Sequence, residues 1–453
     1  MSDLAANSGL TPEQLADRML HRRAVDAVIW GMPVVNFDLM FQQMVALGGD
    51  WNQIVWWPGL LDWKNQTLTP NPDVIYLMPF FNTEAGPVVF EVPPADDGVL
   101  NGSVMDRWQA AIEDIGPGGV DKGKGGKYLI LPPGFAAEDV PEGYIPMPSY
   151  TYRGYALVRS VLKSGSDADV ATAIAYSQRL KVYPLAAAAD PPQTAYIDAA
   201  GTVFDSTIPY DMRFFESLAR MVTAEPWLER DLAMIDPLKT LGIARGEPFA
   251  PDARTTAVLK DAIVEAHGWI ETLYGVTPPF YPGKRWFFPA TDEFSKSVQG
   301  NFRVPDSYPT DNRANNYSLA FFSAKHIGES QYYLMVGYDR DGSPLDGGAS
   351  YRLNVPAGVP VKQYWSITVY DRETHAFIRE SSRQGRSSQS PGLAVNADGS
   401  VDLDFGPSAP QGRETNWIPT VAGRKFELLA RFYGPEPALF QKTWQLNDIE
   451  RTS

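Results

Sequence analysis

Two side chains able to bind a ligand or exchange a proton lie two positions apart in a proline-stiffened turn. Asn71 and Asp73 alternate with prolines in the stretch Thr69-Pro-Asn-Pro-Asp-Val-Ile-Tyr76. Proline fixes φ and pushes the preceding residue toward extended backbone, so both side chains lose little further freedom when they bind. Residues of these two types also commonly hydrogen-bond the backbone of their own turn. The stretch is therefore either a preorganised site, with Tyr76 at its edge, or an ordinary turn.

A second carboxylate, Asp106, stands toward the far end of the same predicted β unit and is followed by Arg107. If the sheet brings Asp106 and Asp73 together, the pair could share a proton as catalytic acid and base. The same oxygens, with Asn71, could instead hold Ca²⁺ or Mg²⁺. The structural alternative is a salt bridge between Asp106 and an arginine: Arg107, Arg159 or Arg431.

Histidine is scarce, and no His-x-His or His-Glu-x-x-His spacing typical of zinc sites occurs among the four histidines. His375 follows a predicted strand and lies in a turn, so it is the histidine to test as a catalytic base. The chain has no cysteine, which excludes thiol nucleophiles and disulfides, and no Gly-x-Ser-x-Gly elbow. Carboxylates are therefore the more plausible catalytic groups.

The C-terminal part of the chain combines aromatic faces with amide and guanidinium donors. Such groups orient a ligand carboxylate or hydroxyl against an apolar wall, although the same aromatics also suit the core of a sandwich. Strand alternation places Arg431 and Tyr433 on one face and Phe432 on the other. The candidates for substrate binding in the whole chain are Asn71, Tyr76, Arg107, Trp365, Asn416, Trp417, Arg431 and Tyr433.

Composition sets the class of protein. The 453 residues are enough for two or three domains, and 38 Gly, 38 Pro, 12 Trp, 21 Tyr and 22 Phe favour a loop-rich β architecture. A net charge of −15 argues against nucleic-acid binding, because an acidic surface repels phosphates. No secretory leader or membrane span is visible, so the chain as written is expected to be cytoplasmic, or periplasmic if a leader was removed.

Helical and extended patterns alternate in four blocks, at 1–50, 51–165, 166–278 and 279–453. Thr11 opens a capping box and predicts a helix, which Gly31 and Pro33 are expected to interrupt before a second one. Short apolar runs such as Val88–Val92 predict a small β-sandwich or barrel in the second block. The third block is predicted to be a helical insertion, and the turns of the fourth predict a jelly-roll-like sandwich. We therefore expect a mainly β fold with a helical insertion.

Several motifs resemble those of one bacterial family, a tandem pair of domains of unknown function numbered twelve-fifty-four (N-terminal) and twelve-fourteen (C-terminal). The N-terminal motif residues are Asn71, Asp73, Tyr76, Gly86–Val89 and Asp106. The C-terminal ones are Tyr364–Tyr370, Asn396–Ser400, Asn416–Pro419 and Arg431–Pro435. Pro72 and Val74 depart from the family pattern, which more often has Asn and Thr there. The resemblance implies the fold and carries no reaction with it.

Two functions fit these residues. The first is a hydrolase or lyase acting on a small amphipathic or polyhydroxylated substrate in a cleft between two β domains, with Asp73 as base or metal ligand and Asp106 as its partner. The second is a non-catalytic protein that binds a carbohydrate or lipid through Trp365, Trp417 and Tyr433. We also expect a homo-oligomer, most simply a dimer that packs through the C-terminal sandwich.

Overall fold

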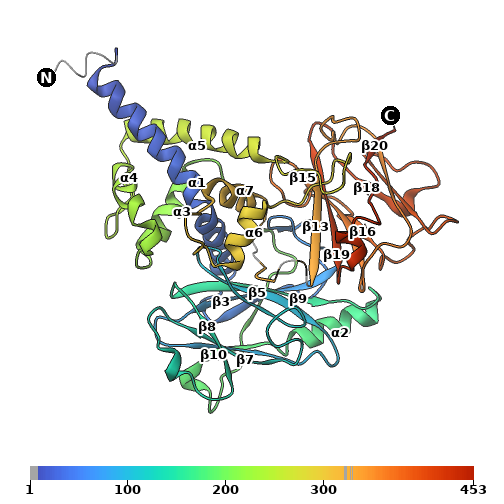
Figure 1. The fold of residues 1–453 in the computed structure, drawn as a ribbon, viewed down its shortest axis with the longest axis horizontal. Helices are drawn as coiled ribbons and strands as arrows, with labels where there is room; N and C mark the ends of the chain where they lie inside the picture. Colours follow the sequence, from blue (N-terminus) through green and yellow to red (C-terminus); the bar gives the residue numbers. More distant parts are fainter. Residues whose placement is uncertain (1–8, 321–323, 327, 329, 453) are drawn as a thin grey trace.

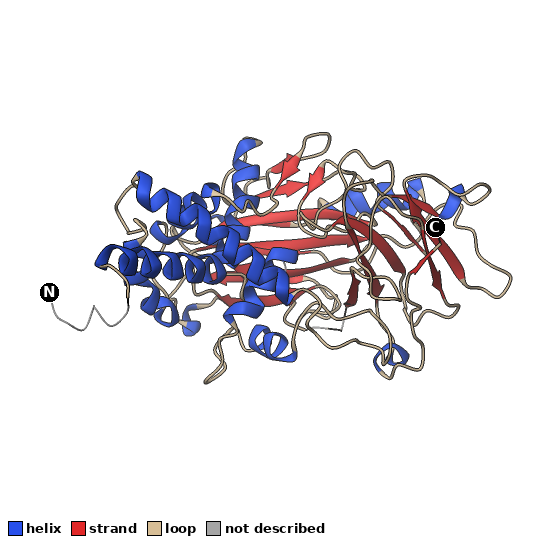
Figure 2. Ribbon diagram, turned by 90° about the horizontal axis from the view of Figure 1, so that it is seen from above, coloured by secondary structure: helices blue, strands red, loops and turns tan. Residues whose placement is uncertain are grey.

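The computed structural model describes residues 9–320, 324–326, 328 and 330–452. Most helices gather in one block, the N-terminal strands form a second block and the C-terminal strands a third (Figure 1). Seen from above, the strands extend away from the helical block toward the C-terminus (Figure 2). The mainly β fold predicted from the sequence is confirmed, with the strands divided among five separate sheets in the described part of the chain.

The N-terminal β unit is built from two large sheets that pack face to face. The six-stranded sheet has the order β11 (Tyr196–Asp198), β1 (Gln53–Trp56), β3 (Val74–Asn82), β9 (Arg153–Val161), β5 (Leu100–Asp106) and β6 (Ala111–Ile115). The four-stranded sheet has the order β10 (Lys181–Pro184), β4 (Val88–Val92), β7 (Gly126–Leu131) and β8 (Tyr144–Pro148). A two-stranded sheet pairs β12 (Phe204–Asp205) with β2 (Asn65–Gln66).

The C-terminal β unit has two four-stranded sheets around an apolar core. One has the order β13 (Gln331–Val336), β19 (Phe426–Tyr433), β15 (Trp365–Asp371) and β16 (Gly385–Ser387). The other has the order β18 (Trp417–Pro419), β17 (Val401–Gly406), β14 (Tyr351–Val355) and β20 (Glu450–Arg451). Alternation holds in β19: Phe432 faces the core of the sandwich, while Leu429 and Tyr433 face a second core shared with the helices and the N-terminal unit.

The helices are α1 (Pro12–Ala46), α2 (Asp167–Ser177), α3 (Met212–Thr223), α4 (Ile235–Thr240), α5 (Ala253–Leu273), α6 (Asp292–Gln299), α7 (Thr310–Leu319) and α8 (Pro437–Phe440). Helix α1 packs against α3, α5 and α7, so the helical block draws on three separate stretches of the chain. The range 166–278, expected to be helical, also contributes β10, β11 and β12 to the sheets. Strand β10 pairs with β4 in an antiparallel arrangement. Its neighbouring residues Val182 and Tyr183 point to opposite faces of the sheet, where each is buried in a different apolar cluster, and this burial favours the strand.

Helix α1 is continuous, which corrects the expected interruption at Gly31 and Pro33. Thr11 and Gln14 form the predicted capping box. Burial on several sides overrides the local helix-breaking tendency: a side chain at position 31 would meet Leu218 of α3 at 2.8 Å, so glycine permits close packing there. Helix α1 is also long and apolar enough, by length and composition alone, to cross a membrane, yet 83% of its apolar window is buried in the protein.

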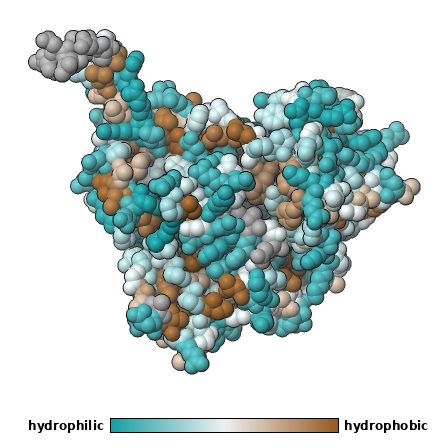
Figure 3. Space-filling view, in the orientation of Figure 1, coloured by the Kyte–Doolittle hydropathy of each residue, from teal (hydrophilic) through white to brown (hydrophobic). Residues whose placement is uncertain are grey.

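The surface seen in Figure 3 is mixed in character. Hydrophobic residues form small separate patches among hydrophilic ones on this face. Large exposed hydrophobic side chains come from different parts of the chain, for example Val264 of α5 and Val395 of the C-terminal unit. Scattered residues of this kind are normal on a protein surface.

Candidate functional site

A row of polar side chains crosses the six-stranded sheet on the face that turns toward the C-terminal unit. Tyr76 of β3 lies directly opposite Arg159 of β9, and Arg159 lies directly opposite Asn101 of β5. Directly opposed residues of antiparallel strands point to the same face of the sheet. The Arg159 guanidinium lies 5.5 Å from the centre of the Tyr76 ring. A buried cation and a phenol therefore stand side by side in the middle of this sheet.

The C-terminal unit presents a second row of the same kind. Tyr333 of β13 lies opposite Arg431 of β19, which in turn lies opposite Ser366 of β15. The Arg431 guanidinium lies 5.7 Å from the centre of the Tyr333 ring. Each β unit thus contributes one arginine–tyrosine pair.

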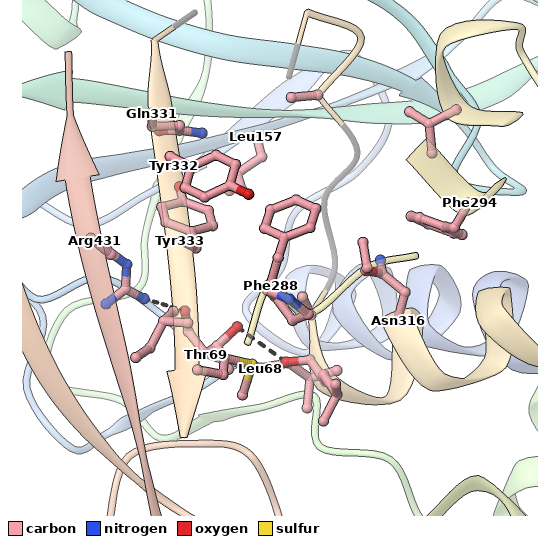
Figure 4. Close-up of a pocket in the computed structure, with 18 of the residues that line it drawn as sticks. Leu68, Thr69, Leu157, Phe288, Phe294, Asn316, Gln331, Tyr332, Tyr333 and Arg431 are labelled. Atoms are coloured by element: carbon pink, nitrogen blue, oxygen red, sulfur yellow. Dashed lines mark hydrogen bonds between the residues drawn. The ribbon is translucent and has the colours of Figure 1, made fainter. Parts of the chain in front are cut away.

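The two arginine–tyrosine pairs line one pocket between the β units. Its empty volume is about 910 Å³, open mouth included. Away from the arginines its walls are mainly apolar, and Figure 4 shows Phe288, Leu157 and Phe294 among them. We name this space the interdomain pocket. Its full lining is Leu68, Thr69, Tyr76, Leu157, Arg159, Phe288, Pro289, Ala290, Phe294, Val298, Asn316, Leu319, Ala320, Ala324, Gln331, Tyr332, Tyr333, Met335, Leu429 and Arg431.

Arg431 is a buried cation, 2% exposed, whose hydrogen bonds all go to neutral oxygens within the described part of the chain. It donates to the carbonyls of Thr69 (2.7 Å) and Pro70 (3.1 Å), to the Thr368 hydroxyl (2.8 Å) and to the Tyr370 hydroxyl. Burial alone would lower the pKa of Arg431, but the phenols around it, Tyr370 first, raise its pKa overall. Arg431 is therefore fully charged in the pocket wall.

The turn that carries Asn71 joins the two β units. The Asn71 amide group donates to the hydroxyls of Tyr364 and Tyr433, each at 2.9 Å, and both tyrosines belong to the C-terminal unit. The backbone N–H of Asn71 donates to the Tyr76 hydroxyl at 3.1 Å, and Arg159 donates to the same oxygen at 3.3 Å. Asn71 and Tyr433 thus form the wall behind the interdomain pocket, and Tyr76 presents a phenol oxygen held by two N–H donors.

Thr69, the first residue of this turn, has a φ of +41°, which is rare for a β-branched residue. Its backbone N–H donates to the carbonyl of His375 at 2.6 Å, and its hydroxyl donates to the carbonyl of Leu319 at 3.1 Å. These two bonds hold the conformation that points the Thr69 carbonyl at Arg431 (Figure 4). Strained backbone of this kind clusters at functional sites.

Asp73 lies behind the turn and does not line the interdomain pocket. Its Oδ1 and Oδ2 face the C-terminal sheet, where Oδ2 is buried with no hydrogen-bond partner among the residues described. Burial raises the pKa of Asp73 above its ordinary value of 3.8, and the charge of Arg431 and the hydroxyls of Ser387 and Ser366 oppose this rise in part. The carboxyl is therefore easier to protonate in the folded protein than in the unfolded chain.

Replacing Asp73 with asparagine is expected to stabilise the protein near neutral pH. A carboxyl whose pKa is raised by folding costs stability once it ionises, so the wild-type protein loses stability as the pH rises through the raised pKa. Below the ordinary pKa both forms are neutral and the gain disappears. Thermal unfolding should show a melting temperature a few degrees higher for Asp73→Asn at about pH 7 and no difference near about pH 3.5. A gain that is equal at both values would contradict this account.

Asp106 lies far from Asp73, which excludes the expected acid–base pair. Strand β9 pairs with β3, which begins directly after Asp73, and with β5, which ends at Asp106. On β9, Val161 lies opposite Val74, and Gly154 lies opposite Asp106. Seven residues of extended strand separate these points by about 23 Å. The Asp106 Oδ1 accepts hydrogen bonds from the backbone of Trp108 (2.8 Å) and Ala110 (2.9 Å), so it shapes its own turn.

The proposed salt bridges of Asp106 with Arg107, Arg159 or Arg431 do not form in the described structure. Burial raises the pKa of Asp106, and the nearest opposing charges are those of Arg230 and Arg313. Asp106 is thus a buried structural residue at the helical side of the sheet.

Arg107 is also remote from the interdomain pocket. Its guanidinium lies 3.3 Å from the Glu225 carboxylate, with both side chains buried, and it donates to the carbonyl of Met221 at 3.0 Å. Arg107 therefore anchors the end of α3 to the sheet, and its predicted role in substrate binding is not supported by its position.

His375 is buried beside a carboxylate, away from the lining of the pocket. Its Nδ1 lies 2.7 Å from Glu427, and Arg372 pairs with Glu271 at 2.8 Å on the same side of the sheet. The backbone of His375 adopts a φ of +53°. The carbonyl of His375 accepts a hydrogen bond from the backbone N–H of Thr69, and Thr69 lines the pocket.

The remaining candidates do not meet the pocket either. Trp365 points into the core of the C-terminal sandwich. The Asn416 amide hydrogen-bonds the backbone of Ala394 and Asp402, and the Trp417 indole donates to the carbonyl of Gly406. Within the described ranges, no group of three or more histidine, aspartate or glutamate side chains is arranged to hold a metal ion.

Sequence reasoning missed Arg159 as a ligand-binding residue, and it missed Tyr333 altogether. Arg159 carried a signal: it is a single cation within the apolar run Tyr155–Val161, where the other strand positions are apolar or small. A charge that is buried in a sheet needs a compensating partner or a function. Tyr333 carried no such signal, because a tyrosine in an apolar strand is usual.

The comparisons with known proteins agree with the predicted family. Residues 51–184 match the model described as "Protein of unknown function (DUF1254)", and residues 330–437 match "Protein of unknown function (DUF1214)". The two matched regions together make up more than half of the chain. The protein therefore belongs to the family that carries these two domains in tandem. Tyr76 and Arg159 lie in the first domain and Tyr333 and Arg431 in the second, so the pocket is formed between the two.

One solved structure shows the same overall fold. The VPA0106 protein from Vibrio parahaemolyticus aligns with a TM-score of 0.60 and 17% identity, over 96% of this chain and 100% of that one. An uncharacterised protein from Burkholderia cenocepacia aligns with a TM-score of 0.43 and 11% identity, over 96% of this chain and 94% of that one. No curated protein matches the sequence.

Proposed function

We propose that this protein binds a small amphipathic organic anion, a carboxylate with an apolar chain, in the interdomain pocket. The observation that carries the proposal is the pair of arginine–tyrosine rows. One comes from each domain, and both border the same largely apolar pocket.

The energetics of the buried arginines favour an anionic ligand. A buried charge is costly unless it is paired, and Arg431 has neutral hydrogen-bond partners. A carboxylate that enters the pocket could accept hydrogen bonds from the guanidinium groups that line it, and arginine binds carboxylates with strong charge-assisted hydrogen bonds. The apolar walls formed by Phe288, Phe294 and Val298 suit an acyl chain better than a sugar, because a sugar would leave its hydroxyls without partners there.

The pocket is lined mainly by apolar side chains with a few polar and charged groups among them, the composition usual for small-molecule sites. Octanoate is therefore a suitable probe, with octanol and octylamine as probes of the same chain length and different charge. Isothermal titration should show that octanoate binds, that octanol binds about tenfold more weakly or worse, and that octylamine does not bind measurably. Equal affinity for the acid and the alcohol would refute the role of the arginines, and no binding of either would refute the proposed site.

An enzymatic role, as a hydrolase or lyase, is the second candidate, and the position of Tyr76 favours it. The Tyr76 hydroxyl borders the pocket and is oriented by two N–H donors, so it is well placed to exchange a proton with a bound ligand. This residue takes the place of Asp73 and Asp106 in the catalytic hypothesis. Product formation from a panel of amphipathic acids, lost in Tyr76→Phe, would distinguish an enzyme from a binding protein.

The finer features of the architecture stay proposals as well. The two four-stranded sheets of the C-terminal unit are compatible with a jelly-roll-like sandwich. A dimer through this unit is proposed from the sequence, and the scattered surface hydrophobics give it no added support.

A further inference from the structure

A smaller chamber adjoins the interdomain pocket next to Arg159. It has an empty volume of about 320 Å³, and it shares Arg159, Ala324 and Gln331 with the interdomain pocket. We name it the side chamber. In contrast to the larger pocket, polar side chains dominate its walls: Asn101, Ser103, Asp114, Arg159, His326, Ser330 and Gln331.

Two amide oxygens in the side chamber lack hydrogen-bond donors. Asn101 is 5% exposed, and its Oδ1 is buried with no donor among the residues that the structure describes. The Oε1 of Gln331 is likewise buried with no donor among the described residues. An unsatisfied buried acceptor costs about 1–3 kcal/mol, so such atoms in a cavity point to a ligand that donates to them.

Ser103 and Asp114, two other polar residues of the chamber, already have hydrogen-bond partners. The Ser103 hydroxyl donates to Asp114 at 2.7 Å, and Asp114 also accepts from the backbone of Lys325 (3.1 Å) and His326 (2.7 Å). Asp114 therefore has internal partners and is no obvious counter-ion for a cationic ligand. The nearby charge of Arg159 further disfavours a cation, so a neutral hydroxyl is the donor that fits.

The pairing of β5 with β9 determines how far the ligand hydroxyl can lie from the ligand carboxylate. Asn101 lies directly opposite Arg159 on the neighbouring strand, and Gln331 lines both spaces. A carboxylate held by Arg159 thus lies at the boundary, with its chain in the interdomain pocket. We propose that the ligand is a hydroxy acid whose hydroxyl, on a carbon near the carboxylate, enters the side chamber and donates its proton to the amide oxygen of Asn101 or of Gln331. This inference rests on the proposed function.

Three acids of equal chain length test the inference: octanoate, 2-hydroxyoctanoate and 8-hydroxyoctanoate. By isothermal titration we expect 2-hydroxyoctanoate to bind the wild-type protein about fivefold more tightly than octanoate, the effect of one hydrogen bond to an unpaired acceptor. The 8-hydroxy isomer should bind no better than octanoate, because its hydroxyl would lie among apolar walls. Equal binding of octanoate and 2-hydroxyoctanoate would overturn the inference while the proposed function stands. Failure of all three to bind would overturn the proposed function itself.

Variants then locate the contact. In the double variant Asn101→Leu/Gln331→Met the affinity ratio of 2-hydroxyoctanoate to octanoate should fall to about one, since both acceptors are removed, and at least one of the two single variants should lower it. Gln42→Met is the matched control: Gln42 donates to Asp38 on α1, outside both spaces, so the ratio should stay near fivefold. The two test residues lie on different strands, and the ratio is independent of modest stability loss. A ratio unchanged in both test variants would overturn the assignment.

Discussion

Arg159→Met is expected to lower the affinity of the protein for octanoate by about 10–150-fold. A charge-assisted hydrogen bond to a carboxylate contributes roughly 1.5–3 kcal/mol, which corresponds to about 10–150-fold in affinity. The methionine side chain keeps most of the volume and the apolar contacts, so the loss reports mainly the charge. Isothermal titration with octanoate measures it.

Arg153→Met provides the matched control on the same strand. Arg153 stands at the other end of β9, where it pairs with Glu84 at 2.8 Å on the surface. Its replacement should leave the affinity for octanoate within about twofold, since it does not line the pocket. The melting temperature of Arg159→Met without ligand checks that the variant is folded before its affinity is compared. Octanoate binding by Arg159→Met at the wild-type level would rule out the proposed site.

Arg107→Ala is expected to cost about 3–5 kcal/mol of unfolding free energy, the usual effect of breaking a buried ion pair from one side. Glu225 would remain buried without its cation, although its oxygens still accept from the backbone of Tyr152 and Arg153 at 3.0 and 2.8 Å. The carbonyl of Met221 would also lose a donor. Urea unfolding at neutral pH measures the loss as a lower midpoint.

Arg254→Ala serves as the control for this effect. Arg254 pairs with Asp17 at 2.7 Å, but both side chains are largely exposed, so its loss should cost less than about 1 kcal/mol. Folded Arg107→Ala should also bind octanoate as the wild type does, because Arg107 is not in the pocket. Equal unfolding midpoints for the two variants would show that the buried pair contributes no more than a surface pair. A selective loss of octanoate binding would instead restore Arg107 to the site.

The sequence by itself determined the local structure and part of the site. The capping box at Thr11 and the strand Val88–Val92 follow from spacing within a few residues, and both are present. Alternation placed Arg431 and Tyr433 on one face of β19, where they meet the shared core. The turn at Asn71 was found because two prolines and two polar side chains lie within five positions. These properties depend on neighbours in the chain, so periodicity and turn chemistry reveal them.

Only the tertiary structure decided which of these residues form a site. Strand register placed Arg159 opposite Tyr76 and moved Asp106 to the far end of β9, although Asp106 is nearer to Tyr76 in sequence. Packing of the two β units brought Arg431 to the pocket that Arg159 lines. Packing against α3 likewise kept helix α1 continuous through Gly31. Register and packing depend on contacts between residues tens to hundreds of positions apart, and local spacing contains no record of them.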